Sequence, residues 1–211
     1  MRVSQADHAG AQAYALNRLA NELAPIWVYH SLVHTRDDVL PAAERLAALE
    51  GVGGEAALLL CTAACYHDLG FIEQRNQHEI ISAHMAAAAL PAFGYSPSQI
   101  ALVERMILAT QLQQSPRTLL EQLLADADLD VLGRPDFLAR NQNLRTELAS
   151  CGVQFSDVAW YTGQISFLQG HHYWTATMRR LRDRQKQQNI ITLQALLIEA
   201  AANDDRLAFE H

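Results

Sequence analysis

The sequence has few of the features that mark membrane, secreted or disordered proteins. Aromatic residues make up 7% and charged residues 18% of its 211 residues, and half of the residues are hydrophobic, which is ordinary for a folded globular protein. The cysteines number three, and an odd count argues against a disulfide framework. No apolar run approaches the roughly 20 residues needed to cross a bilayer, and the first residues lack the hydrophobic core of a signal peptide. We therefore expect a cytoplasmic protein without membrane partners.

Several functional signatures are also missing. The sequence contains no phosphate-binding P-loop and no Rossmann glycine pattern. Its formal net charge is -7, whereas a general nucleic-acid binder is expected to carry a basic surface. The basic residues cluster once, and this cluster is either a solvated helix face or a phosphate-binding patch. Its members are Arg179, Arg180, Arg182, Arg184 and Lys186.

The sequence does contain a dominant helical pattern. Alanine and leucine are abundant, apolar residues recur every three or four positions, and no alternating strand pattern is evident. No internal repeat or long linker divides the chain, so we expect one all-α domain over residues 1–211, a bundle of about eight to ten helices. The predicted helices cover residues 4–23, 29–50, 54–68, 78–91, 97–112, 117–125, 134–150, 156–183 and 192–208.

Local residues qualify some of these helices. Ser96 followed by Pro97 is typical of a helix amino terminus. Pro41 lies within a helical pattern and should kink or restart that helix. Gly163 and Gly170 weaken the prediction of one continuous helix over 156–183. Cys61 and Cys65 are four residues apart in an apolar stretch, which predicts that both are buried packing residues.

The first chemically informative segment is LLLCTAACYHDLGF, which ends in His67 and Asp68. A helix this apolar belongs in the core, so its polar end should be buried as well. Burying an ionised carboxylate costs several kcal/mol unless it is paired or bound to a cation. A metal site therefore explains the pair, and the alternative is that His67 caps the helix while Asp68 accepts backbone hydrogen bonds.

Adjacent helical residues point about 100° apart, so further ligands must come from other helices. Upstream, YHSLVHTRDDV places His30 and His34 on one helix face. Downstream, LLADADLDVLG places Asp128 between Asp126 and Asp130 in an apolar context. Imidazole and carboxylate together suit Mn, Fe, Co, Ni or Zn, and Mg where water completes the shell.

These segments resemble, in order, the motifs of the HD-domain superfamily of metal-dependent phosphohydrolases. The resemblance covers about residues 28–135, with residues 136–211 expected to form helices packed on that core. It implies one divalent metal ion held by His34, His67, Asp68 and Asp128. It also implies that Asp68 orients or deprotonates the attacking water, with Glu79 as a second candidate for that role.

The resemblance makes His30 and Arg36 candidates for contacting the substrate, and Arg75 follows soon after the His-Asp pair. The expected substrate is a small phosphorylated compound such as a nucleotide, and the sequence allows a homo-oligomer. Members with two metals carry further histidines, whereas here Gln111, Gln113 and Gln114 stand where related small members often have one. His78 and His84 are six residues apart and should face different ways, which favours a single metal.

Three functional hypotheses remain open at this stage. The first is a single-metal phosphohydrolase, and the second is an iron-dependent oxygenase on the same scaffold, which needs about two more histidine ligands. The third is a catalytically silent helical module that binds a nucleotide or a partner. Outside the motifs, we expect the cluster His171–Trp174 to serve packing and capping, and Asp37 with Asp38 to lie on a solvated face.

Overall fold

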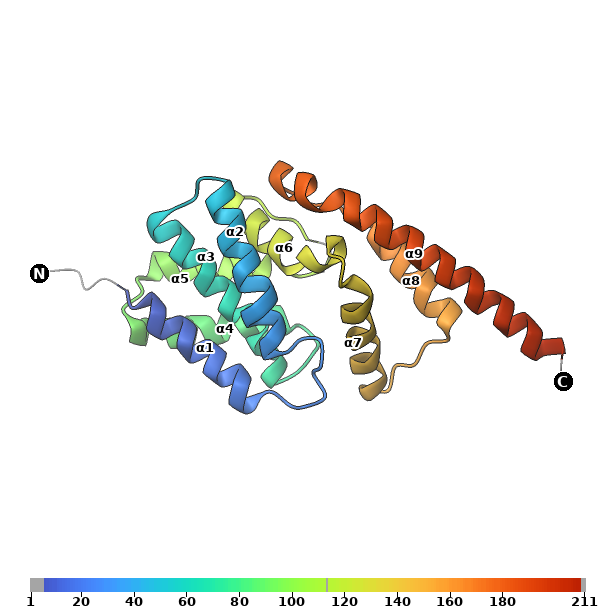
Figure 1. The fold of residues 1–211 in the computed structure, drawn as a ribbon. Helices are drawn as coiled ribbons and strands as arrows, with labels where there is room; N and C mark the ends of the chain where they lie inside the picture. The colour runs from blue at the N-terminus through green and yellow to red at the C-terminus, as the bar shows by residue number, and fades with distance from the viewer. Residues whose placement is uncertain (1–5, 113, 210–211) are drawn as a thin grey trace, which may run out of the picture. The chain divides into compact units, whose positions relative to one another are not determined.

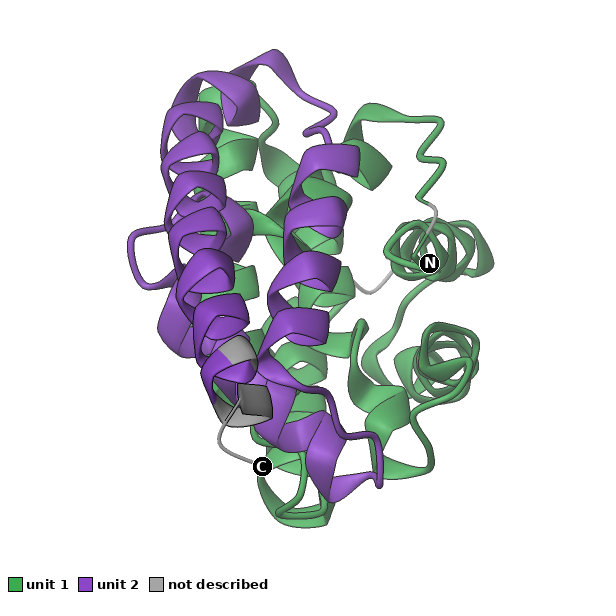
Figure 2. Ribbon diagram, turned by 90° about the vertical axis from the view of Figure 1, so that its right-hand side faces the viewer, with its two compact units in different colours: residues 1–130 green, residues 131–211 purple. Residues whose placement is uncertain are grey.

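We describe the protein from a computed structural model, which covers residues 6–112 and 114–209. Within these ranges every regular element is helical, as predicted, and α1 to α9 are the α-helices (Figure 1). The chain divides into two compact units, residues 1–130 and 131–211 (Figure 2).

The first unit is built around α3. Its helices are α1 (His8–Glu22), α2 (Leu40–Leu49), α3 (Gly54–Tyr66), α4 (His78–Ala89), α5 (Pro97–Leu108) and α6 (Leu119–Asp128). Helix α3 contacts α1, α2, α5 and α6, and all eight residues of its second half, 59–66, are buried. The cysteine prediction is confirmed, because Cys61 and Cys65 are both buried and burial raises their pKa values to about 11 and about 12.

The segment before α2 departs from the predicted continuous helix over 29–50. A π-helix occupies His34–Val39, and the Leu40 N–H donates to the carbonyl of Thr35, five residues earlier. Pro41 has no N–H, and its ring would clash with the carbonyl four residues earlier in a regular helix. The wider π-turn ends directly before α2, whose first turn contains Pro41. The expected restart at this proline is confirmed.

The turn after α3 is held closely against α4. A 3-10 turn spans Leu69–Ile72, and the Gly70 N–H donates to Ser82 Oγ at 2.7 Å. A Cβ built on Gly70 would lie 2.2 Å from the His78 carbonyl oxygen, so only glycine allows this approach. This contact fixes the start of α4 beside the end of α3. The predicted cap at Ser96 is also confirmed, with a capping box formed by Ser96 and Gln99.

One segment of the first unit passes a simple test for a membrane span. Residues Gly54–Ile72 are long and apolar enough by length and mean hydropathy, which reaches 1.2. This differs from the expectation that no apolar run approaches that length. However, 72% of the tested window is buried inside the protein, as in the core helix of a globular protein.

The second unit contains α7 (Phe137–Ser150), α8 (Asp157–Gly170) and α9 (Ala176–Phe209). The prediction of one helix over 156–183 and another over 192–208 is wrong in its boundaries. The chain breaks at 171–175 and then continues as a single helix of 34 residues. Two side chains of α9 stabilise this break: Lys186 donates to the His171 carbonyl at 2.7 Å, and Arg179 donates to the carbonyls of Tyr173 and Trp174.

These contacts change the interpretation of the basic cluster. Lys186 is buried, and its ammonium lies 5.2 Å from the centre of the Tyr173 ring. His171 is the C-cap of α8, so a cation at its carbonyl satisfies an acceptor that the helix leaves unpaired. The cluster is therefore not a uniformly solvated face, and the segment His171–Trp174 has the capping role that we expected.

Candidate metal centre

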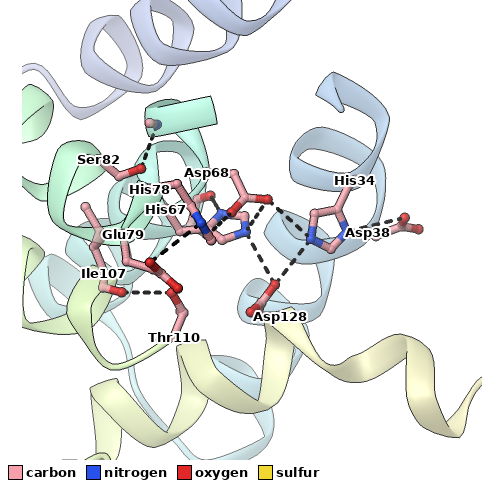
Figure 3. A network of polar contacts seen from close by, with 12 residues as sticks. His34, Asp38, His67, Asp68, His78, Glu79, Ser82, Ile107, Thr110 and Asp128 are labelled. Atoms are coloured by element: carbon pink, nitrogen blue, oxygen red, sulfur yellow. Dashed lines mark hydrogen bonds and ion pairs between the residues drawn. The ribbon is translucent and has the colours of Figure 1, made fainter. Parts of the chain in front are cut away.

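Four side chains from three segments of the first unit converge on one point (Figure 3). His34 comes from the π-helix, His67 and Asp68 follow α3 directly, and Asp128 is the last residue of α6. Asp128 Oδ1 lies 3.2 Å from His34 Nε2 and 3.4 Å from His67 Nε2. Asp68 Oδ2 lies 3.2 Å from His67 Nε2 and 3.7 Å from His34 Nε2. Residues up to 94 positions apart thus contribute one polar atom each.

The spacing of these atoms suits a shared metal ion. Two atoms that each lie about 2.1 Å from an ion are about 3.4 Å apart at a tetrahedral angle and about 3.0 Å apart at a right angle. The four distances between a carboxylate oxygen and an imidazole nitrogen, 3.2 to 3.7 Å, are close to these values. His34, His67 and Asp68 form a group whose ligand atoms all lie within 4.8 Å of one another.

Burial supports the same interpretation. His67 and Asp68 are 1% and 3% exposed. His67 Nε2 and Asp68 Oδ2 are within ion-pair distance, yet neither atom has a hydrogen-bond partner among the described residues. Buried polar atoms without such partners are costly, and a divalent cation between them would satisfy both. The residues present therefore fit a metal ion.

Hydrogen bonding fixes which nitrogen of His67 faces the centre. His67 Nδ1 donates to the carbonyl of Ala64 at 2.8 Å, one turn earlier in the same segment. With its proton on Nδ1, the neutral ring directs the Nε2 lone pair toward Asp68 and Asp128, as a ligand must. Metal-binding histidines usually have such a partner on the second nitrogen.

The charges at the centre are strongly coupled. Burial lowers the pKa of His67, but the carboxylates of Asp68 and Asp128 outweigh burial and raise this pKa well above its ordinary value. Burial raises the pKa of Asp128, but the nearby imidazoles of His34 and His67 outweigh burial and hold this pKa below its ordinary value. The two carboxylates thus gather negative charge at one buried point, and this charge would attract a divalent cation.

Comparison with known proteins gives one informative match. No family model and no curated protein matches the sequence. The chain is similar in structure to the crystal structure of a predicted HD superfamily hydrolase from an uncultured Thermotogales bacterium, with a TM-score of 0.61. The alignment covers 90% of this chain and 91% of that chain. The chain has the helical fold of an HD-superfamily protein. Because the two sequences are 20% identical, the match shows the fold alone.

Within this HD fold, the structure corrects the prediction for Asp38. Asp37 is exposed and forms an ion pair with Arg36 at 2.7 Å, as a surface residue would. Asp38 is instead buried, and its Oδ2 lies 4.0 Å from His34 Nδ1. His34 and Asp38 are four residues apart, a spacing that places both on one helix face. The four-residue spacing from His34 to Asp38 could have predicted this contact from the sequence. Because Asp38 directly follows the exposed Asp37, sequence analysis places both aspartates on a solvated face.

Asp38 and Asp37 form a matched pair for a test of how His34 is oriented. We expect Asp38→Asn to weaken metal binding by about 10- to 100-fold, because carboxylates behind histidine ligands orient the ring and raise its basicity. Asp37→Asn should leave the affinity unchanged. Calorimetric titration of both variants with Mn measures this difference directly. Equal affinities would show that Asp38 does not act on His34.

His78 is a neighbour of the centre that sequence analysis considered only as an extra ligand. Its Nε2 lies 3.4 Å from Asp68 Oδ1, the carboxylate oxygen opposite the convergent atoms (Figure 3). Burial lowers the pKa of His78, but the hydrogen bond to Asp68 outweighs burial and raises this pKa. Glu79 is buried beside it, with Oε2 3.6 Å from His78 Nδ1. His84 is exposed, so the two histidines do face different ways, as predicted.

The other predicted residues lie at varying depth around the centre. His30 is half-buried, stacks on Phe71 at 4.2 Å and lies 6.1 Å from the His34 ring, both measured between ring centroids. Arg36 is exposed and engaged by Asp37, and Arg75 is exposed in the loop before α4. Gln111 is exposed, and Gln113 lies outside the described residues.

Proposed function

We propose that this protein is a divalent-metal-dependent phosphohydrolase that cleaves an ester or anhydride of a small phosphorylated compound. One observation carries the proposal: an oxygen of Asp68 and an oxygen of Asp128 each lie 3.2 to 3.7 Å from the Nε2 atoms of both His34 and His67. The HD-type fold supports the reaction class by analogy only, because folds do not determine functions. The alternative, an iron-dependent oxygenase, would bind two irons per chain and would need ligands beyond these four residues.

The position of each residue suggests its role in the reaction. His34, His67, Asp68 and Asp128 would hold one divalent ion, which when bound lowers the pKa of a water molecule and polarises a phosphoryl oxygen. Asp68 presents its second oxygen to His78, which keeps the carboxylate oriented. Glu79 lies beside His78, with its Oε2 3.6 Å from His78 Nδ1, and is the second candidate for the general base. The identity of the ion among Mn, Fe, Co, Ni, Zn and Mg is open to measurement.

The substrate would be recognised by residues beside the centre. Tyr29 stacks on His34 with 5.1 Å between ring centroids, and His30 lies next to it, so both could contact a bound compound. Arg75 is a better candidate than Arg36 for balancing phosphate charge, because the guanidinium of Arg36 already binds Asp37. A nucleotide is the substrate class that we propose to test first.

The deciding experiment combines elemental analysis with a hydrolysis panel. Purified protein is analysed for metal and then assayed with nucleotides and simple phosphoesters in the presence of added Mn. About one metal per chain together with hydrolysis would support the proposal. Two irons per chain would replace it with oxygenase chemistry. Bound metal without turnover of any phosphate compound would instead indicate a binding module.

Removing the metal should also lower thermal stability. A ligand that binds only the folded state stabilises it by about 2.7 kcal/mol when present at about 100 times its dissociation constant. We therefore expect Mn to raise Tm by several degrees over protein treated with a chelator. Differential scanning calorimetry measures this shift, and Ca, which prefers more oxygen ligands than this site offers, is the control ion. Identical melting curves with and without Mn would contradict the metal site.

A further inference from the structure

A buried ammonium group closes the break between α8 and α9. Lys186 is 4% exposed, and its Nζ donates to the His171 carbonyl at 2.7 Å and lies 3.4 Å from His171 Nδ1. The same ammonium lies over the ring of Tyr173, which is fully buried. Among the residues that the structure describes, no carboxylate forms an ion pair with Lys186. One side chain thus joins the end of α8 to the interior of α9, and the two helices pack against each other (Figure 1).

The contact between Lys186 and His171 requires a neutral imidazole. An ammonium can only donate a hydrogen bond, so His171 Nδ1 must accept, and the proton of the neutral ring lies on Nε2. His171 Nε2 is buried and has no hydrogen-bond partner among the described residues. A second proton would have to bind Nδ1, where it would face the ammonium as donor against donor and as charge against charge. The geometry therefore accommodates His171 only in its neutral form.

The charged groups around His171 act in the same direction. From α9, Lys186 faces the ring directly. Within the break, the exposed His172 lowers the pKa of His171, as Lys186 does. From α8, the neighbouring side chain is the uncharged ring of Phe167. Asp183 of α9 acts on Lys186 and favours the charged form of that lysine, so it strengthens the positive charge that His171 meets.

We propose that the contact between Lys186 and His171 is an acid-sensitive latch between α8 and α9. While His171 is neutral, the latch holds the break at residues 171–175 closed. When His171 is protonated, it repels the ammonium, and the break and the first turn of α9 open. The first turn depends on the same break, because Arg179 donates to the carbonyls of Tyr173 and Trp174. The latch uses no residue of the metal centre, so it does not depend on the proposed function.

The protonation of His171 sets the sign of the pH dependence. Burial and then the charge of Lys186 lower the pKa of this imidazole from an ordinary 6.5 to about 4. A ring released to solvent regains its ordinary pKa, so protonation favours the open break. The closed form therefore has its full stability above about pH 6.5 and loses it as the pH falls toward about 4. Between about pH 7 and about pH 5, this difference in pKa favours opening by about 10- to 20-fold.

Amide hydrogen exchange measures the opening directly. Mass spectrometry follows a peptide that covers residues 171–179, with the intrinsic effect of pH on exchange divided out. In the native protein, the protection of this peptide should fall by about 10- to 20-fold between about pH 7 and about pH 5. His171→Gln keeps an acceptor for Lys186 and cannot gain a proton in this range, so its protection should not fall. His172→Gln changes the exposed neighbouring histidine, and this control should respond as the native protein does.

Titration of the His171 ring by NMR tests the cause of the opening. The native pKa should be about 4, and Lys186→Met, which removes the ammonium but keeps an unbranched side chain, should raise it by at least about one unit. Circular dichroism verifies that the variants fold. An ordinary pKa of His171 in the native protein would overturn the latch without any variant. Protection that does not fall in the native protein, or that falls equally in His171→Gln, would overturn it as well, and an unchanged pKa in Lys186→Met would exclude Lys186 as the partner.

Discussion

Asp68→Asn should abolish measurable metal binding and, with it, any phosphate hydrolysis. The substitution keeps the shape of the side chain and removes the charge of a carboxylate whose Oδ2 faces His34 and His67. Loss of a direct ligand should exceed the 10- to 100-fold effect typical of residues behind the ligands, so we expect more than about 100-fold weaker binding. Titration calorimetry with Mn and the phosphoester assay measure the two losses.

The metal-free Asp68→Asn protein should remain folded, because the substitution keeps the size of the side chain and removes a buried charge rather than adding one. Its circular dichroism spectrum should match that of the native protein, and its Tm should no longer respond to Mn. Asp37→Asn is the control for charge alone, since it removes an exposed aspartate close to the site in sequence. Native affinity in the Asp68→Asn variant would exclude Asp68 as a ligand.

The sequence was sufficient to predict the helical fold and the residues that meet at the centre. Apolar periodicity is a local property, and it located the core helix α3 and placed His67 and Asp68 at its end. The order of the motifs predicted that His34 and Asp128 would join them, and the structure brings all four together. Metal binding by these residues stays a prediction until it is measured.

What the sequence could not supply depends on contacts between distant segments. The break between α8 and α9 is held by Arg179 and Lys186, whose partners are backbone carbonyls that no residue pattern reveals. Asp38 looked like a surface charge because it follows Asp37, and only the fold shows that one is buried and the other exposed. The contact between His78 and Asp68 likewise depends on how closely α4 approaches the turn after α3.

That close approach makes Gly70→Ala the second variant with a large expected effect. A Cβ at this position would lie 2.2 Å from the carbonyl oxygen and 2.9 Å from the carbonyl carbon of His78. These are backbone atoms at the start of α4, so they cannot rotate away as a flexible side chain would. Forcing extra volume into a packed site costs about 1–3 kcal/mol, and we expect Tm to fall accordingly.

Gly70→Ala should also weaken metal binding by the folded protein. A loss of global stability alone would leave the affinity of the folded protein for metal unchanged. Moving the start of α4 displaces His78 from Asp68 and strains the Gly70 hydrogen bond to Ser82. Gly163→Ala is the matched control: it lies within α8, where no atom approaches the added Cβ within 4 Å. Alanine is favoured over glycine inside a helix by about 0.5–1 kcal/mol, so this variant should melt at the native temperature or above it. The contrary result is a Gly70→Ala protein that melts at the native temperature and binds Mn with native affinity. That result would show that the turn after α3 can shift and that glycine is not needed to hold α4 against the centre.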